Sequence, residues 1–124
     1  MDLLVVDDDP PILKLFGSVG ESCGYKVETM SDAGEFIARC DEKSPDVLVL
    51  DLVMPNVDGI EVLRTMSEME VGSHVLLITG FDPELLERAQ ALAKAWNLNI
   101  IGGMTKPVDP HAVQELLAKL IEDN

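Results

Sequence analysis

The chain has few basic residues, few aromatic residues and only two cysteines, and these scarcities exclude several classes of protein. Nine Lys and Arg residues stand against 23 Asp and Glu residues, so the formal net charge is −14. Binding to nucleic-acid phosphates needs clustered Lys and Arg, so we expect no nucleic-acid surface on this domain. Cys23 and Cys40 have neither CxxC nor Cys/His spacing. We expect them to be reduced, and to pack as small hydrophobic residues.

Long apolar runs are also missing. Apolar residues make up 47% of the 124 residues but occur in short stretches. None approaches the roughly 18 to 20 residues that span a membrane. The start at Met1 and Asp2 lacks the basic region typical of a signal peptide. We therefore expect one cytoplasmic domain over residues 1–124, with no membrane contact.

Short apolar runs alternate with helical patterns five times. The apolar runs at 3–6, 47–50 and 75–78 are typical of strands buried on both faces. The runs at 25–29 and 99–102 are typical of weaker strands nearer the sheet edges. Each helical pattern begins with an aspartate that could cap it: Asp9, Asp32, Asp58, Asp82 and Asp109. This order predicts an α/β fold. We expect a (βα)5 doubly wound, flavodoxin-like parallel sheet with strand order 2-1-3-4-5.

Polar residues stand where four of these strands should end. Asp7 and Asp8 follow the first strand, Asp51 the third, Thr79 the fourth and Lys106 the fifth. The carboxyl ends of parallel strands line one crevice, so these side chains should share a pocket. Carboxylates are hard oxygen ligands for Mg²⁺, whereas an ammonium and a hydroxyl can hold anionic oxygens. The pattern predicts a site for Mg²⁺ and a phosphoryl group.

Four segments together resemble the receiver domain of two-component response regulators over essentially the whole chain. They are VVDDD at 5–9, DLVMPNVDG at 51–59, ITG at 78–80 and TKP at 105–107. Each segment alone is a weak signal, but their order and strand-end positions make the set specific. The resemblance implies that Asp51 accepts a phosphoryl group from a histidine kinase or a histidine phosphotransfer protein.

The resemblance also implies roles for the other residues. Asp8, Asp51 and the backbone carbonyl of Val53 would bind Mg²⁺, with Asp7 acting largely through water. Thr79 and Lys106 would hold the phosphoryl group, and the Lys106–Pro107 peptide would be cis. Such a domain is a signalling switch rather than a metabolic enzyme, with only self-directed, Mg²⁺-dependent phosphotransfer and autodephosphorylation.

Phosphorylation would change the surface of the fourth helix, fifth strand and fifth helix. An output domain or a downstream protein would read that surface, and a phosphorylation-dependent homodimer is one form the output could take. The run 98–107 also resembles receivers that precede cyclic-di-GMP phosphodiesterase domains. Val53 and Phe81 stand two residues beyond Asp51 and Thr79, and their bulk beside the path of the hydrolytic water predicts slow dephosphorylation.

The chain departs from the family at residue 103, where many receivers have an aromatic residue that swings inward on activation. Here that residue is Gly103. We therefore expect switching through the backbone at Gly102 and Gly103, or through Phe81. Asp9 is interpreted first as a helix cap and second as part of the metal shell.

Three alternatives remain at this point. A flavin- or nucleotide-binding module would need a phosphate loop after the first strand, where this chain has acidic residues that repel phosphate. A haloacid-dehalogenase-type phosphatase would need a second Asp where Val53 stands. A phosphorylation-independent, receiver-like interaction module would keep the fold, but the intact acids, Thr79 and Lys106 argue against it.

Overall fold

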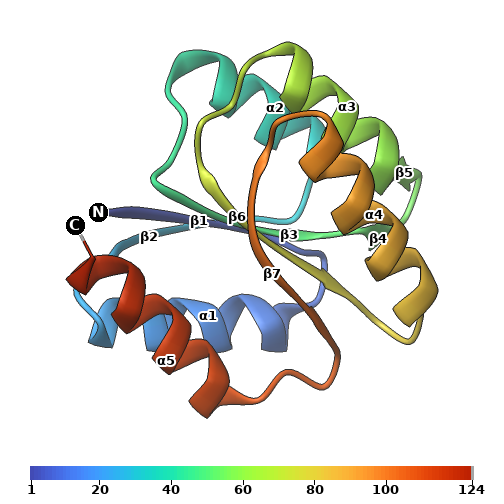
Figure 1. The fold of residues 1–124 in the computed structure, drawn as a ribbon. Coiled ribbons are helices and arrows are strands. Elements are labelled where there is room, and N and C mark those ends of the chain that lie inside the picture. Colours follow the sequence, from blue (N-terminus) through green and yellow to red (C-terminus); the bar gives the residue numbers. More distant parts are fainter. Residues whose placement is uncertain (124) are drawn as a thin grey trace.

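Five parallel strands form one sheet, and Figure 1 shows this sheet between two groups of helices. The computed structural model describes residues 1–123, apart from the side chain of Asp41. The strands are β1 (Asp2–Val6), β2 (Lys26–Met30), β3 (Val47–Asp51), β6 (His74–Thr79) and β7 (Asn99–Thr105). Their order in the sheet is β2-β1-β3-β6-β7. Counting these five strands alone, this is the 2-1-3-4-5 order, so the fold prediction is confirmed.

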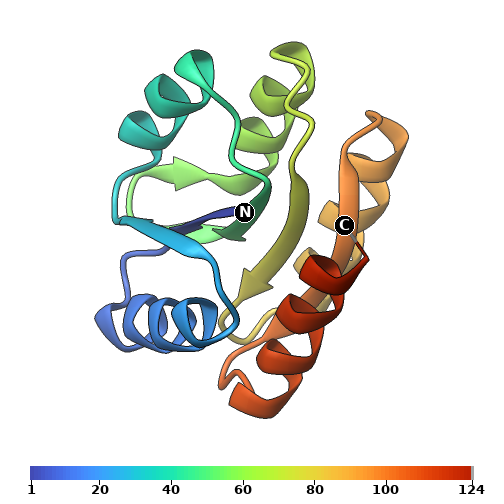
Figure 2. The same cartoon turned by 90° about the vertical axis from the view of Figure 1, so that its left-hand side faces the viewer.

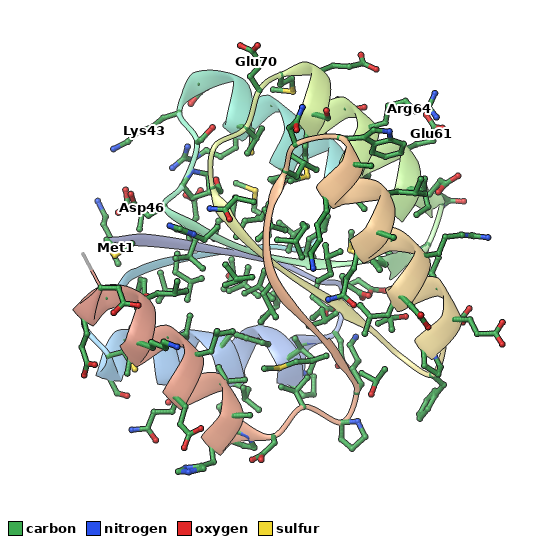
Figure 3. The ribbon with its side chains drawn as sticks, in the orientation of Figure 1. Met1, Lys43, Asp46, Glu61, Arg64 and Glu70 are labelled. Carbon is green, nitrogen blue, oxygen red and sulfur yellow. The ribbon has the colours of Figure 1, made fainter. Side chains whose placement is uncertain are left out.

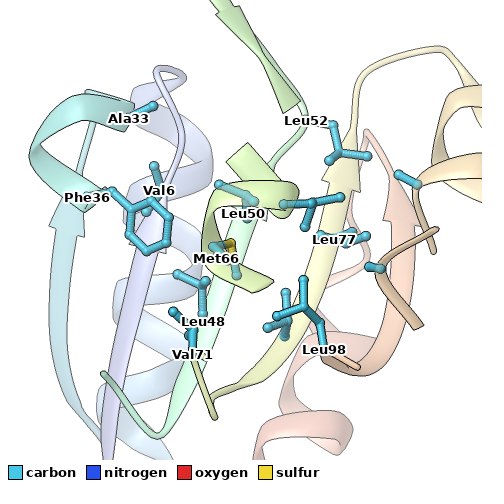
Figure 4. Packing of buried hydrophobic residues seen from close by; sticks show 14 of the residues in the cluster. Val6, Ala33, Phe36, Leu48, Leu50, Leu52, Met66, Val71, Leu77 and Leu98 are labelled. Atoms are coloured by element: carbon cyan, nitrogen blue, oxygen red, sulfur yellow. The ribbon is translucent and has the colours of Figure 1, made fainter. Parts of the chain in front are cut away.

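Five helices cover the two faces of the sheet. They are α1 (Pro10–Ser22), α2 (Ala33–Glu42), α3 (Gly59–Glu68), α4 (Pro83–Ala95) and α5 (Pro110–Glu122). Helices α1 and α5 lie on one face, and α2, α3 and α4 lie on the other (Figures 1 and 2). The apolar stripes of these helices pack on the sheet in two clusters, one for each face. Phe36 and Met66 belong to the α2–α4 cluster (Figure 4), and Phe16 and Leu117 to the other.

The outer surface carries the charge. In Figure 3, Glu61, Arg64 and Glu70 point away from the sheet. Cys23 and Cys40 are both free, and Cys40 is buried, as expected for reduced cysteines. Within residues 1–123, no helix combines the length and the apolar character that crossing a bilayer requires.

Aspartates begin the helices, but they do so in two ways. In four helices the side chain of the N-cap residue accepts a backbone hydrogen bond from the first turn; these residues are Asp32, Asp58, Asp82 and Asp109. Asp9 also occupies an N-cap position, but its side chain makes no capping hydrogen bond. Asp9 is therefore the N-cap residue of α1 by position, as expected, but its side chain does not take part in capping. Its carboxylate lies instead 3.7 Å from the ammonium nitrogen of Lys106.

A small hairpin between β3 and α3 was not predicted. Strands β4 (Val53–Met54) and β5 (Val57–Asp58) pair antiparallel, and Asn56 in the turn has a positive φ of 60°. The chain then enters α3 at Gly59. A Cβ on Gly59 would lie 2.5 Å from the carbonyl oxygen of Leu52, so a glycine is needed for this close approach.

Candidate functional site

Two buried carboxylates lie at the carboxyl ends of neighbouring strands. Asp7 follows β1 and is 0% exposed, while Asp51 ends β3 and is 1% exposed. Backbone amides orient both side chains: Asp9 N donates to Asp7 Oδ1 over 2.9 Å, and Val53 N donates to Asp51 Oδ1 over 3.0 Å. The fold thus holds two acidic groups away from solvent at one edge of the sheet.

Lys106 reaches both carboxylates from the end of β7. Its Nζ donates to Asp7 Oδ1 over 3.2 Å and to Asp51 Oδ2 over 3.4 Å. The backbone also fixes this residue, because Lys106 N donates to the carbonyl oxygen of Thr79 over 2.8 Å. The Lys106–Pro107 peptide is cis. The ammonium therefore lies within reach of two buried acids on different strands.

A third carboxylate completes an acidic cluster. Asp7, Asp8 and Asp51 can each offer an oxygen, and these oxygens lie within 4.8 Å of one another. Asp8 is exposed, so the cluster opens to solvent on that side. The Val53 amide donates its hydrogen bond to Asp51, and the Val53 side chain is 53% exposed. Hard oxygen donors at this spacing fit a divalent cation such as Mg²⁺.

Thr79 lies at the same edge, at the end of β6. Its side chain is 0% exposed, and its Oγ1 has no hydrogen-bond partner among the described residues. A buried hydroxyl without a partner costs stability, which makes it a candidate ligand-binding group. A Cβ built on the next residue, Gly80, would meet no atom within 4 Å, so space is open beside the hydroxyl.

Burial and mutual repulsion change the protonation of the site. The pKa of Asp7 is raised to about 7, chiefly by burial; the nearby Asp51 also raises it, and the hydrogen bonds from the Asp9 amide and Lys106 oppose the rise. Burial alone would lower the pKa of Lys106, but its contacts with Asp7 and Asp51 outweigh this and raise it. The lysine therefore stays charged, while Asp7 titrates near neutrality when no cation is bound.

A family model described as the response regulator receiver domain matches residues 3–118. The chain belongs to this family. The receiver domain is 36% identical over 118 residues to the transcriptional regulatory protein TrcR of Mycobacterium tuberculosis, covering 95% of the chain and 43% of that protein. It therefore spans less than half the length of this relative.

Solved structures agree with the family. A response regulator from Colwellia psychrerythraea superposes with a TM-score of 0.86 at 31% identity, covering 99% of this chain and 98% of that one. The BeF3-activated DrrB receiver domain superposes with a TM-score of 0.76 at 27% identity, covering 98% and 97%. The receiver domain is thus consistent with two-component signalling.

The structure brings together most of the residues predicted from the sequence, and it adds others. Asp7, Asp8, Asp51 and Lys106 are close neighbours, and Thr79 lies at the same strand edge. Asp9 is nearer to Lys106 than its interpretation as a cap implied. The run of three aspartates after β1 was the available signal for its position. Leu86 and Gln90 of α4 lie over Gly103, where a Cβ would come within 2.8–2.9 Å of their side chains, and this packing has no signal in the sequence.

Proposed function

We propose that this receiver domain accepts a phosphoryl group on Asp51 from a histidine kinase or a histidine phosphotransfer protein. The observation that carries this proposal is the contact between Asp51, a buried carboxylate at a strand end, and the ammonium of Lys106. In this step an oxygen of Asp51 forms a bond to phosphorus while the bond from phosphorus to the donor nitrogen breaks. The imidazole of the donor leaves with the electron pair of that bond.

Charge is the main obstacle to this step, because two anions must approach each other. The positive charge of Lys106 lies where phosphoryl oxygens would gather, and the Val53 amide holds the Asp51 carboxylate in one orientation. Thr79 supplies a hydroxyl with no other partner among the described residues, which can donate to a phosphoryl oxygen. We assign Lys106 and Thr79 to binding and neutralising the transferred group.

Asp7, Asp8, Asp51 and the backbone carbonyl of Val53 would hold Mg²⁺, with Asp7 acting largely through water. The cluster of carboxylate oxygens supports this assignment. When bound, Mg²⁺ supplies positive charge against the phosphoryl oxygens. Asp7, whose pKa is raised to about 7, would take up a proton as the pH falls, so we expect Mg²⁺ binding to weaken in acid.

In this proposal the domain is a cytoplasmic switch whose chemistry is self-directed phosphotransfer and autodephosphorylation. Its output would pass through the surface of α4, β7 and α5 to an attached domain or a separate protein. TrcR is described as a transcriptional regulatory protein and is more than twice as long as the matched region. This supports an attached output domain in that relative, and for this chain the output stays a proposal. A phosphorylation-dependent homodimer is one such output.

Intact mass after incubation with Mg²⁺ and acetyl phosphate tests the proposal. We expect a gain of one phosphoryl group that requires the metal and is lost in Asp51→Asn. Asp46→Asn is the matched control, because Asp46 is an exposed aspartate just before the opposite end of β3. It should still gain the group.

The competing function is a phosphorylation-independent interaction module with the same fold. It predicts no mass gain in the unaltered chain even where Mg²⁺ binding is shown by calorimetry. The intact set of Asp51, Thr79 and Lys106 favours phosphorylation, because a module without this chemistry has no need to bury an unpartnered hydroxyl beside paired charges.

A further inference from the structure

The side chain of Asp9 does not cap α1, and the start of that helix explains why. Pro10 and Pro11 occupy its first two positions, and proline has no backbone N–H. The next amide, that of Ile12, donates to the backbone carbonyl oxygen of Asp9 over 3.0 Å. The four aspartates that do cap a helix each accept from an amide of its first turn. The Asp9 carboxylate has no such donor, so it is available to another partner.

That partner is the ammonium group of Lys106. Its Nζ lies 3.7 Å from Asp9 Oδ2, compared with 3.1 Å from Asp7 Oδ2 and 3.4 Å from Asp51 Oδ2. Asp7 and Asp51 are buried and accept hydrogen bonds from Nζ, whereas the Asp9 side chain is 41% exposed and lies beyond hydrogen-bond distance. Asp9 therefore makes the weakest and most solvent-exposed of these three ionic contacts.

A phosphoryl group on Asp51 would compete with Asp9 for Lys106. An ammonium group has three N–H donors, and two hydrogen bonds from Nζ go to Asp7 and Asp51. The negative oxygens of a phosphoryl group would need the remaining donor and the positive charge of Lys106. The Asp9 carboxylate partly neutralises that charge, and it also repels an anionic phosphodonor as the donor approaches.

We propose that Asp9 is a positioning residue that holds Lys106 in the unphosphorylated domain and slows phosphorylation of Asp51 by anionic donors. The inference rests on the proposed function. When the phosphoryl group arrives, Lys106 releases Asp9 rather than the buried carboxylates, because a solvent-exposed ion pair contributes little stability. Loss of the Asp9 charge should therefore raise the rate of phosphorylation, whereas loss of the Lys106 charge should lower it.

Asp9→Asn tests this inference, with Asp109→Asn as the matched control. Each substitution removes one negative charge from an N-cap residue, and asparagine caps a helix as well as aspartate does. Asp109 differs from Asp9 because its side chain accepts from the His111 amide, and among the described residues it forms no ion pair with Lys106. Asp9→Asn should raise the initial rate with acetyl phosphate about fivefold, and Asp109→Asn should stay within about twofold.

Intact-mass time courses measure these rates. Mg²⁺ is held at a concentration that saturates each variant, as established by calorimetry, so that a change in metal affinity does not alter the comparison. The Asp9 amide, which donates to Asp7 Oδ1, is retained in Asp9→Asn. Asp9→Glu keeps the negative charge and should stay within about twofold of the unaltered chain. Urea unfolding of each variant detects any general loss of stability.

The charge of the phosphodonor supplies a readout that a purely structural role would not change. Acetyl phosphate carries more negative charge than phosphoramidate at neutral pH, so the gain in Asp9→Asn should be smaller with phosphoramidate. Salt screens charges that are exposed to solvent. The gain with acetyl phosphate should therefore shrink as the concentration of potassium chloride rises.

Several outcomes would overturn the inference. Asp9→Asn could react no faster than the unaltered chain, Asp109→Asn could show an equal gain, or Asp9→Glu could match Asp9→Asn. A gain that is the same with both donors and insensitive to salt would also overturn it, because Asp9 would then act through local structure and not through its charge. Failure of the proposed function looks different, since acetyl phosphate would then add no mass to the unaltered chain.

Discussion

The middle of the sheet and three residues at its carboxyl edge, Asp7, Asp51 and Thr79, are equally shielded from water, but they bury opposite chemistry. Val49 and Leu50 are 0% and 1% exposed, and Asp51, the next residue along β3, is 1% exposed. In the middle, apolar side chains pack on both faces and the backbone is paired in parallel ladders. At the edge, Thr79 Oγ1 is buried without a hydrogen-bond partner within the described residues, and the buried Asp7 Oδ2 has only an ion pair with Lys106 Nζ, at 3.1 Å.

This difference indicates what each region is built for. Buried polar atoms are nearly always satisfied in native proteins, and the exceptions concentrate where a ligand or a reaction completes them. The middle of the sheet therefore supplies stability. In the proposed function, the carboxyl edge gives up stability to keep groups available for Mg²⁺ and a phosphoryl group. Substitutions in the two regions should consequently change different measured quantities.

The largest expected effect is in the core. Phe36 is 0% exposed and packs in the α2–α4 cluster, so Phe36→Ala should lower the free energy of unfolding by about 3–5 kcal/mol. Urea unfolding measures this loss. The affinity of the remaining folded protein for Mg²⁺ should stay within about twofold, because Phe36 belongs to the apolar cluster and not to the group of carboxylates. A large loss of Mg²⁺ affinity in folded Phe36→Ala would contradict the expectation that core substitutions change stability and leave binding intact.

The next largest effect is expected on the phosphorylation chemistry at the carboxyl edge of the sheet. Lys106→Met keeps much of the side-chain volume and removes the charge that contacts Asp7 and Asp51. We expect the rate of phosphorylation by acetyl phosphate to fall about 100-fold, the scale seen when one preorganised charge-stabilising donor is lost. Intact-mass time courses measure it. Lys26→Met, on the far edge strand β2, should leave the rate unchanged, and an equal loss in both variants would contradict the assignment.

The sequence predicts these two regions unequally. The central strands could be predicted because continuous apolar runs are typical of strands buried on both faces. Strand β7 was expected to end at residue 102 but runs to Thr105, because pairing with β6 outweighs the low strand propensity of two glycines. Strands β4 and β5 have two residues each, too few to show any periodicity.

The candidate site was predictable as a set of strand-end residues, because parallel strands place their carboxyl ends together. Its internal contacts were not. The closeness of Lys106 to Asp7 and Asp9 depends on how β7 and α1 approach across the edge. The contact of Gln90 with Gly103 depends on the lateral position of α4, which no local pattern encodes.

A smaller effect of opposite sign is expected at Asp7. Its raised pKa means that its ionised form is less favourable in the folded chain than in the unfolded one. Without Mg²⁺ at pH 8, Asp7→Asn should therefore raise the free energy of unfolding by about 1–2 kcal/mol. The same change should weaken Mg²⁺ binding in calorimetry. If Asp7→Asn instead destabilises the metal-free protein, the buried Asp7 carboxylate does not lower the stability of the folded chain.

The pH dependence of stability sharpens this point. Between the ordinary pKa of 3.8 and the folded value of about 7, the folded chain keeps a proton on Asp7 that the unfolded chain releases. The contribution of Asp7 to stability is therefore full below about pH 4, declines as the pH rises toward 7, and is lost above it. Urea unfolding in EDTA should show this decline in the unaltered chain and a shallower one in Asp7→Asn.

The smallest stability effect is expected at Phe81, which offers a direct contrast with Phe36. Phe81 is 91% exposed, so Phe81→Ala should change the free energy of unfolding by less than about 0.5 kcal/mol. Its effect should appear instead as faster loss of the phosphoryl group, since its bulk stands two residues beyond Thr79. Intact mass after removal of acetyl phosphate measures that rate. An unchanged rate would show that Phe81 does not obstruct the path of the hydrolytic water. A large loss of stability would show that the Phe81 side chain contributes packing as a core residue does. Phenylalanine would then stabilise the fold in both regions, and only the buried acids would distinguish the carboxyl edge from the middle of the sheet.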